Sequence, residues 1–498
     1  REYYHHGWQS WSLAAWLPVD RAMPTPRPKL LHPLQYDPAY VSRGALHGSW
    51  VGAVRLGHSR VLLLGALQPD AHVELHGAGP SHGDRGGASL HGWYEPAQSN
   101  EEQSNAKQAD EMQVEAPEWF VGMGPEDEVF SQYAAVLGTR LGSASGKPTP
   151  RVWCSWYSYY ASITEERLHK TFTALADLPF DVLQVDDGWQ RTVGDWQPNA
   201  EFPSGMGALA RQIRQTGRTA GLWLAPLVVT ASSPVSREHP DWLVHDETGN
   251  PVSGGFNWGE DLYAIDTTHP EARDWLAGLM GRVRAWGYDY LKLDFLYAAA
   301  LPGRRFRDLP REAAYREGLE VLRDAMGEDA YFLTCGAPIL PSLGLCDALR
   351  VGPDVAGHWE SRRDAELLAN PAIPGTRNAI RTTIHRLWLA PLVAVDPDVA
   401  YFSAEHTELT RDQRRLLQDL AHLCRYKATS DLPRWLTGTE RENLVTFLET
   451  DPQVRRRDRY RYEVGTREVD FSAVVPLPPP ARGLRALSGR VVGWAAGR

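Results

Sequence analysis

The sequence has few cysteines, which excludes a disulfide framework and a thiolate metal site. Only four occur among its 498 residues, namely Cys154, Cys335, Cys346 and Cys424. Neither a Cys-x-x-Cys pair nor a Cys/His group with metal-ligand spacing is present. Four cysteines in so long a chain are most simply free thiols in a reducing compartment. The sequence therefore predicts a cytoplasmic protein.

Long apolar runs and long basic clusters are also missing. The longest apolar stretches, such as Gly221 to Ala231, are shorter than the roughly 20 residues that a helix needs to span a bilayer. The net charge is −10, from 52 basic and 62 acidic residues, and the short basic run Arg455 to Arg457 is flanked by Asp451 and Asp458. These features argue against a membrane protein and against a nucleic-acid partner.

Tryptophan is the residue type in excess, with 19 in the chain. An indole packs against the apolar face of a pyranose ring, so this supply suits sugar binding, although many of these side chains are also expected in the core. Hydrophobic residues (43%) and charged residues (23%) occur in proportions that are ordinary for a globular protein. A chain of this length is expected to form about three domains.

The part of the chain before residue 145 predicts β-structure. Short apolar runs without a clear helical period lie there between Gly-rich turns. These runs are Val51–Leu56, Val61–Leu67, His72–Leu75 and Leu90–Tyr94. A polar and acidic stretch from Gln98 to Gln113 is expected to be a surface loop, and Ser143 to Pro150 has the composition of a linker.

Beyond Pro150, short apolar runs alternate with helical stretches, which is typical of parallel strands joined by helices. The predicted strands are Val152–Trp156, Val182–Val185, Thr219–Leu224, Tyr290–Leu293, Tyr331–Leu333, Ala348–Val351, Leu387–Val395 and Ala428–Leu432. Roughly seven or eight such units over about 280 residues predict a (β/α)8 barrel, whose chemistry lies where strands end. A doubly wound sheet is the alternative, but the Gly-rich nucleotide turn that usually accompanies it is absent.

Helices and a small C-terminal β-domain complete the predicted architecture. Ser162 and Glu165 have the spacing of a capping box at the start of one helix, and a second helix is expected to open at Thr268. A polar amphipathic helix is expected from roughly Thr410 to Cys424. Beyond residue 435, the predicted strands are Asn443–Leu448 and Arg490–Trp494.

Two acids at strand ends are the main candidates for chemistry. In YLKLDF, residues 290 to 295, alternate side chains face the same side, so Lys292 and Asp294 both point toward the barrel mouth. A neighbouring cation keeps a carboxylate ionised, as a nucleophile requires, although a structural ion pair is the alternative.

The second acid, Asp354, follows the turn Gly352-Pro353 at the end of another predicted strand. A general acid needs a raised pKa, which burial or the nearby Asp294 anion would provide. The alternative is a turn aspartate that hydrogen-bonds its own backbone. Two carboxylates at two strand ends are what double-displacement glycoside hydrolysis requires.

Adjacent acids, Asp186 and Asp187, end a third predicted strand. They repel one another unless a ligand or a cation satisfies both. Neighbouring carboxylates can each hold a sugar hydroxyl, whereas a metal would need further ligands at sensible spacing, which the sequence lacks. Capping of a helix is the alternative.

Other candidates are aromatic or basic. Trp223 can form a pocket wall or pack inside the barrel, and Arg350 can bind a hydroxyl or pair with an acid. Trp8 and Trp11, in the segment GWQSWS, can cover a pocket or fill an interface between domains.

Seven motifs, in this order, resemble those of the α-galactosidases of glycoside hydrolase family 36. They are GWQSWS, VWCSWYSYY, QVDDGWQ, GLWLAP, YLKLDFLYA, TCGAPILPSLG and LRVGPDVA. The resemblance extends from residue 7 to about residue 432 and implies three domains: an N-terminal β-sandwich (1–147), a central (β/α)8 TIM barrel (148–434) and a small C-terminal β-domain (435–498). Little chain precedes GWQSWS, and Ala337-Pro338-Ile339-Leu340 replaces a Gly-rich run, which indicates a compact member with a reduced sandwich.

Residue by residue, the resemblance implies that Asp294 is the nucleophile and Asp354 the acid/base. Asp186 and Asp187 match the acids that hold the axial 4-hydroxyl and the 6-hydroxyl of the sugar. The other matched positions surround the sugar: Lys292 and Arg350 as basic contacts, Trp223 as an aromatic wall, Trp8 as the N-terminal tryptophan that reaches the pocket, and Cys335 with Gly336 as the pocket floor.

The resemblance therefore implies a retaining α-galactosidase that acts on small α-galactoside oligosaccharides and needs no cofactor. Its two catalytic carboxyl groups should lie roughly 5–5.5 Å apart. Three alternatives remain: a galactosyl transferase of the raffinose-synthase type, an α-N-acetylgalactosaminidase, and an inactive sugar-binding homologue. The presence of both Asp294 and Asp354 disfavours the last. A homo-oligomer is the one macromolecular partner left open.

Overall fold

The structure is a computed structural model. It describes residues 1–20, 37–40, 46–57, 59–77, 88–94, 118–143, 146–360 and 373–477. The predicted surface loop Gln98–Gln113 and the predicted strand Arg490–Trp494 lie outside these residues.

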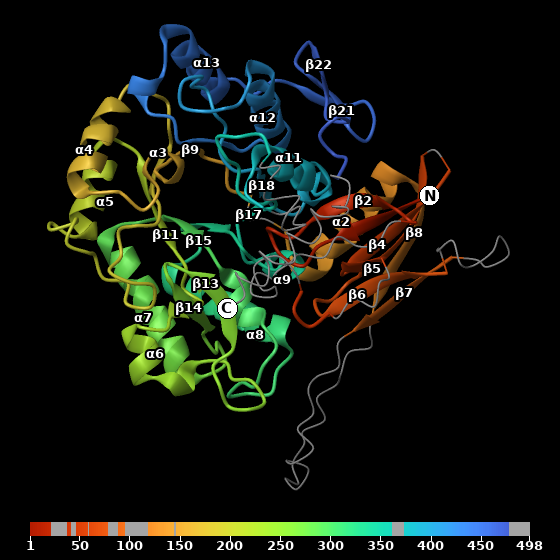
Figure 1. Ribbon diagram of the computed structural model, residues 1–498, viewed down its shortest axis with the longest axis horizontal. Helices are drawn as coiled ribbons and strands as arrows, with labels where there is room; N and C mark the ends of the chain where they lie inside the picture. Colours follow the sequence, from red (N-terminus) through yellow and green to blue (C-terminus); the bar gives the residue numbers. More distant parts are fainter. Residues whose placement is uncertain are drawn as a thin grey trace, which may run out of the picture.

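A sheet of eight parallel strands forms the centre of the molecule (Figure 1). In spatial order the strands are β18 (Ala394–Asp396), β17 (Ala348–Arg350), β16 (Tyr331–Thr334), β15 (Tyr290–Leu293), β11 (Thr219–Leu224), β10 (Val182–Val185), β9 (Arg151–Cys154) and β19 (Lys427–Thr429). The two outermost strands approach each other, because the backbone N–H of Ala400, just beyond β18, donates to the carbonyl of Ala428 in β19 at 2.8 Å. The predicted (β/α)8 fold is confirmed.

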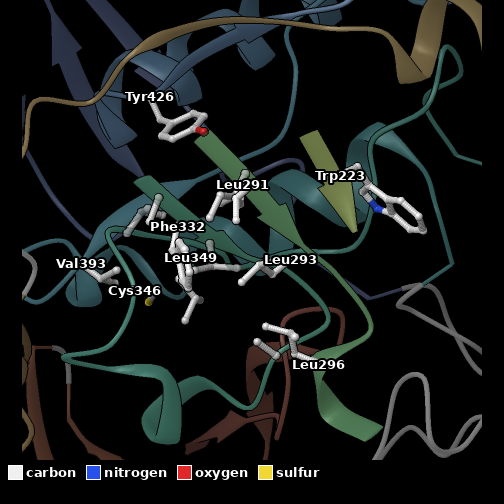
Figure 2. Packing of buried hydrophobic residues seen from close by; sticks show 14 of the residues in the cluster. Trp223, Leu291, Leu293, Leu296, Phe332, Cys346, Leu349, Val393 and Tyr426 are labelled. Carbon is white, nitrogen blue, oxygen red and sulfur yellow. The ribbon is translucent and has the colours of Figure 1, made fainter. Parts of the chain in front are cut away.

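The strands form where the sequence places short buried apolar runs. Leu291, Phe332 and Leu349 lie on three neighbouring strands and pack together in the core, as Figure 2 shows. Alternation along β15 turns Lys292 to the opposite face. One predicted strand, Leu387–Val395, is wrong in its first half, because Leu387–Leu389 is a 3-10 helix (η5). Pro391 lacks the N–H that a strand ladder needs, so β18 begins only after it.

Helices cover the outside of this sheet (Figure 1). The longer ones are α4 (Glu165–Ala174), α5 (Met206–Gln215), α7 (Pro270–Trp286), α8 (Arg311–Met326), α11 (Thr376–Ile384) and α12 (Arg411–Cys424). The predicted cap of α4 is wrong by two residues, because the side chain of Thr164, not Ser162, accepts a hydrogen bond from the Arg167 backbone at 3.1 Å. Helix α12 matches its prediction and begins with a capping box of Thr410 and Gln413.

The N-terminal part is built from two antiparallel sheets that lie beside the barrel (Figure 1). One sheet has the order β2-β1-β4-β5-β8 and the other β3-β6-β7. Their bounds are β1 Glu2–His6, β2 Ala14–Pro18, β3 Leu46–Ser49, β4 Val51–Leu56, β5 Arg60–Ala66, β6 Ala71–His76, β7 Ser89–Tyr94 and β8 Trp119–Pro125. The expectation of β-structure alone missed helix α2 (Glu126–Leu141), which follows β8.

Two helices that the sequence analysis did not predict, one before and one after the barrel, nevertheless have a helical pattern in their sequences. The buried residues of α2, Val129, Phe130, Tyr133, Ala134 and Leu137, recur at helical spacing. The run Asn443–Leu448 lies inside helix α13 (Gly438–Glu449), so its prediction as a strand is wrong; Thr437 and Glu440 form the capping box of α13. A three-stranded sheet follows, made of β20 (Val454–Arg456), β21 (Arg461–Val464) and β22 (Arg467–Asp470).

A buried arginine fastens the N-terminal part to the barrel. The Arg386 guanidinium donates to the carbonyls of Ser10 and Val351, both at 2.8 Å, and of Gly7 at 2.9 Å. The Ser10 N–H in turn donates to the carbonyl of Ala337, just beyond β16, at 3.0 Å. The loop between β1 and β2 is therefore held against the carboxyl ends of the barrel strands. Within the described residues, no helix is long and apolar enough to cross a membrane.

Candidate active site

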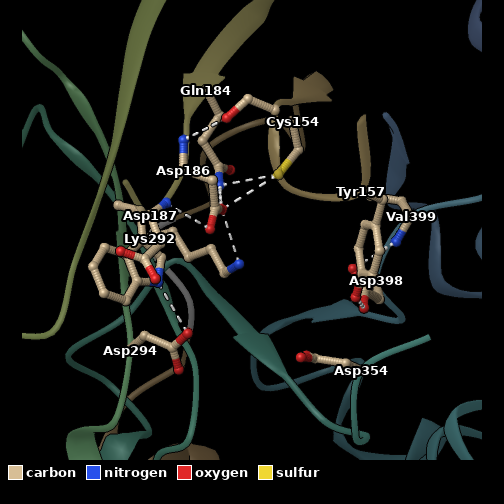
Figure 3. A network of polar contacts seen from close by, with 12 residues as sticks. Cys154, Tyr157, Gln184, Asp186, Asp187, Lys292, Asp294, Asp354, Asp398 and Val399 are labelled. Atoms are coloured by element: carbon tan, nitrogen blue, oxygen red, sulfur yellow. Dashed lines mark hydrogen bonds and ion pairs between the residues drawn. The ribbon is translucent and has the colours of Figure 1, made fainter. Parts of the chain in front are cut away.

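A pocket of about 200 Å³ opens where the barrel strands end. Carboxylates, a lysine and aromatic rings line it: Trp11, Trp156, Asp186, Asp187, Trp223, Asn257, Trp258, Lys292, Asp294, Phe295, Pro353, Asp354 and Pro374. Figure 3 shows Asp294 and Asp354 on opposite sides of an open space, with the Asp354 carboxyl group pointing toward Asp294. The structure thus brings together acids that are distant in the sequence.

Asp294 follows β15 directly and is held by two N–H groups. Its Oδ2 accepts a hydrogen bond from the Trp223 indole at 3.0 Å, and its Oδ1 accepts one from the backbone N–H of Phe295 at 2.9 Å. Phe295 has a φ of 53°, in the left-handed region that a bulky residue rarely occupies. Such conformations concentrate at functional sites. Here the strained backbone gives the Asp294 carboxylate a fixed orientation.

Lys292 pairs with Asp186 and not with Asp294, which corrects the expected contact. Its Nζ lies 3.0 Å from Oδ2 of Asp186, which also accepts hydrogen bonds from the Gln184 amide and, at 3.3 Å, from the Cys154 thiol (Figure 3). Burial is the largest single influence and would lower the pKa of Lys292, but the acidic groups around it, Asp186 foremost and then Cys154 and Asp294, together hold that pKa well above its ordinary value. Lys292 therefore remains a cation at the edge of the pocket.

Asp187 is held by the tip of a β-hairpin that the sequence prediction did not contain. The hairpin joins β13 (Ser253–Asn257) to β14 (Glu260–Ala264), and the indole N–H of Trp258 at its tip donates to Oδ2 of Asp187 at 2.8 Å. Trp258 has a φ of 53°, again unusual for a large side chain. Burial raises the pKa of Asp187.

Helix capping, one alternative interpretation of the paired acids, does not fit the structure. Neither acid caps a helix, since helix α5 begins only at Met206. Within the part of the chain that the structure describes, no group of three or more His, Cys, Asp or Glu side chains is arranged to hold a metal ion. The open side of these carboxylates instead faces the pocket.

Asp354 lies four residues beyond β17 and contacts a buried guanidinium. Arg350 donates to Oδ1 of Asp354 at 3.1 Å, and its other N–H groups bind Asp396 at 2.8 Å and Asp398 at 3.0 Å. The Asp354 side chain remains 37% exposed toward the pocket. The loss of hydration inside the pocket, followed by the negative charge of Asp398, raises the pKa of Asp354 to about 7. Arg350 is thus shared among three carboxylates and lies behind the pocket wall.

Besides Arg350, three more predicted pocket residues do not belong to the lining: Trp8, Cys335 and Gly336. Trp8 is buried, with the Arg311 guanidinium 5.1 Å from its ring; Trp11 lines the pocket instead. Cys335 is buried behind the strand ends, and its N–H donates to the carbonyl of Leu293 at 2.7 Å. Gly336 has a φ of 53°, and a Cβ there would lie 2.9 Å from the Trp11 ring. Gly336 therefore lies directly against Trp11, which lines the pocket.

The pocket residues that the sequence prediction missed come from elements that it did not contain or from the segments between them. Asn257 and Trp258 belong to the hairpin, whose only local signal is the turn glycine Gly259. Trp156 lies within the motif VWCSWYSYY but follows β9 in the short helix α3 (Trp156–Tyr159). Pro374 precedes α11.

Comparison with known proteins defines the class. Residues 128–323 match the Melibiase family. The chain is 46% identical to the Thermus thermophilus α-galactosidase TtGalA, solved in complex with p-nitrophenyl α-D-galactopyranoside; the match covers 95% of this chain and 91% of that chain, with a TM-score of 0.83. The GH36 α-galactosidase AgaA of Geobacillus stearothermophilus shares the fold at a TM-score of 0.56 and 17% identity, over 90% of this chain and 60% of that one.

Matches to curated sequences are shorter. Alpha-galactosidase AgaA of Geobacillus stearothermophilus is 29% identical over 208 residues, which is 38% of this chain and 27% of that protein. Alpha-galactosidase Mel36A of Lactobacillus acidophilus is 26% identical over 163 residues, or 30% and 22% of the two chains. The fold and the site are those of a glycoside hydrolase. The chain belongs to the GH36 α-galactosidase family, which the Melibiase domain marks.

Proposed function

We propose that the protein hydrolyses terminal α-galactosides of the melibiose and raffinose type with retention of configuration. The observation that carries the proposal is the contrast between two facing carboxyl groups. Asp294 accepts two N–H hydrogen bonds, whereas the pKa of Asp354 is raised to about 7 by its burial. One group is suited to attack the sugar and the other to hold a proton near neutral pH. The ligands named for the Thermus thermophilus relative, p-nitrophenyl α-galactoside and stachyose, support this substrate class.

The reaction proceeds in two displacements at the anomeric carbon. An oxygen of Asp294 forms a bond to this carbon while the glycosidic C–O bond breaks, and the leaving oxygen takes the proton of Asp354. The product of this step is a β-galactosyl ester of Asp294. Water then attacks the same carbon, gives its proton to the Asp354 carboxylate, and displaces Asp294 to release α-galactose.

The remaining polar residues orient the sugar. Asp186 and Asp187 accept hydrogen bonds from the 4-hydroxyl and the 6-hydroxyl of the sugar, and Lys292 binds the sugar beside them. Because a site built to hydrogen-bond an axial 4-hydroxyl leaves buried carboxylates poorly paired with an equatorial one, it discriminates against glucose. Trp223 and Trp11 supply apolar faces for the ring.

Hydrolysis of p-nitrophenyl α-galactoside, with the α-glucoside and the β-galactoside as controls, tests the specificity. Activity is expected on the α-galactoside alone. Proton NMR of the first-formed galactose is expected to show the α-anomer, since two inversions retain configuration. Release of the β-anomer would contradict the double displacement. An absence of hydrolysis on all three substrates would favour the transferase or the inactive binding protein.

Trp258→Phe is expected to lower kcat/KM for the α-galactoside roughly tenfold, because it keeps a ring but removes the N–H that holds Asp187. A hydrogen bond to a charged group contributes about 1.5–3 kcal/mol. Trp156→Phe is the matched control, since Trp156 lines the same pocket but its indole N–H has no hydrogen bond to any described residue. Equal losses in both variants would show that ring packing, not the N–H, matters.

We propose three domains, residues 1–147, 148–434 and 435–498, a cytoplasmic location, and neither a nucleic-acid nor a membrane partner. The four cysteines, all free and buried, are compatible with a reducing compartment. Analytical ultracentrifugation distinguishes a monomer from the homo-oligomer left open by the sequence.

A further inference from the structure

Asp398 is a buried carboxylate that contacts two neighbours of Asp354 without lining the pocket. Its Oδ1 accepts a hydrogen bond from Arg350 at 3.0 Å, and its Oδ2 accepts one from the backbone N–H of Val355 at 3.0 Å. The Tyr157 hydroxyl donates to the same Oδ2. Asp398 is only 2% exposed and comes from the loop after β18 (Figure 3). It therefore holds both the side chain that binds Asp354 and the peptide that follows Asp354.

The backbone at Asp398 is itself constrained. Its φ is 77°, outside the range that most non-glycine residues adopt. The Asp398 N–H donates to Oδ1 of Asp396 at 2.8 Å, and the Val399 N–H donates to Oδ1 of Asp398 at 2.8 Å. A strained residue persists only where its surroundings over-determine it, and such residues concentrate at functional sites. The position of the Asp398 carboxylate is thus fixed from both sides.

Charged and titratable groups face Asp354 from several elements. They are Arg350 from β17, Asp398 from the loop after β18, Lys292 and Asp294 from β15, Tyr157 from α3, Tyr401 from the segment before α12, and Cys335 from the end of β16. Arg350 also binds Asp396, so one guanidinium serves three carboxylates. The Arg350 guanidinium is therefore paired mainly with Asp396 and Asp398. Asp398 also places a carboxylate near Asp354. A nearby anion disfavours ionisation of a carboxyl group.

We propose that Asp398 is a positioning residue that orients Asp354 and, through its negative charge, sets the pH range in which Asp354 carries a proton. The inference rests on the proposed function of Asp354 as general acid and base. Because Asp398 does not line the pocket, it acts through Arg350, through the Val355 peptide and through the electric field of its charge.

Asp398→Asn tests the proposal, since it preserves the shape of the side chain and removes the charge. We expect the fall of kcat/KM with rising pH (the falling limb), measured in a profile from about pH 5 to about pH 9, to move roughly one pH unit toward lower pH. The reason is that Asp354 loses its proton more readily without the neighbouring anion. Tyr157→Phe should move the limb in the opposite direction by a few tenths of a unit, because it removes the hydroxyl that partly neutralises Asp398.

Asp431→Asn is the matched control. Asp431 is as deeply buried, lies beyond β19 and accepts N–H groups of Phe402 at 2.6 Å and Ser403 at 2.9 Å. Its substitution should leave the limb in place. An unmoved limb in Asp398→Asn, or a shift toward higher pH, overturns the inference; if that variant does not fold by circular dichroism, the direction of the Tyr157→Phe shift decides. Full raffinose hydrolysis by Asp354→Ala would instead refute the proposed function.

Discussion

Asp294→Ala is expected to lose at least about 10⁴-fold in kcat on p-nitrophenyl α-galactoside, because no other group can form the covalent galactosyl ester. Trp223 and the Phe295 peptide, which hold this carboxylate, would then point at empty space. The measurement is the rate of nitrophenolate release. The variant is expected to fold normally, since the lost side chain faces the pocket.

Azide identifies the missing group. A small anion that fits the space left by the carboxylate should attack the α-galactoside once, with inversion, and give β-galactosyl azide. Asp289→Ala is the control, because Asp289 precedes the same strand β15 but is exposed and paired with Arg214. It should keep full activity. Unchanged activity of Asp294→Ala, or α-galactosyl azide as its product, would refute Asp294 as the nucleophile.

Asp354→Ala is expected to show a loss that depends on the leaving group. Raffinose releases a poor leaving group that needs a proton, so kcat/KM should fall by about 10³-fold, within the usual range for general acid–base catalysis. Nitrophenolate leaves without a proton, so the first step on the aryl substrate should be nearly unchanged. Azide should now trap the galactosyl ester and give α-galactosyl azide, the opposite anomer from the Asp294 variant.

The pH dependence of the wild-type enzyme follows from the same group. Burial raises the pKa of Asp354 to about 7, so the free enzyme carries the required proton below this pH and loses it above. We expect kcat/KM for raffinose to fall as the pH rises through about 7, and this limb to be absent in Asp354→Ala. If Asp354→Ala instead lost equal activity on raffinose and on the aryl substrate, the proton that the leaving group takes would have to come from another residue.

Local patterns predicted the elements that carry the site. The strands β10, β11 and β15 have the bounds that their apolar runs indicate. The acids that follow β10 and β15 line the pocket, as does Trp223 within β11. A strand of alternating side chains directs residues at its end toward the barrel mouth wherever the strand lies. Predictions failed where a local pattern had two interpretations, as in helix α13, whose apolar run also fits a strand.

The sequence by itself determined the barrel, the strand ends and the presence of two candidate catalytic carboxylates. Only the tertiary structure decided their partners: Lys292 lies beside Asp186, Trp223 reaches Asp294, and Asp398 supports Asp354. These contacts depend on strand register, which pairs Trp223 with Lys292, and on loops that meet only when the barrel forms. The same reason explains why Trp11, and not Trp8, lines the pocket. The loop that carries both tryptophans is placed by hydrogen bonds from Arg386, which lies more than 370 positions further along the chain.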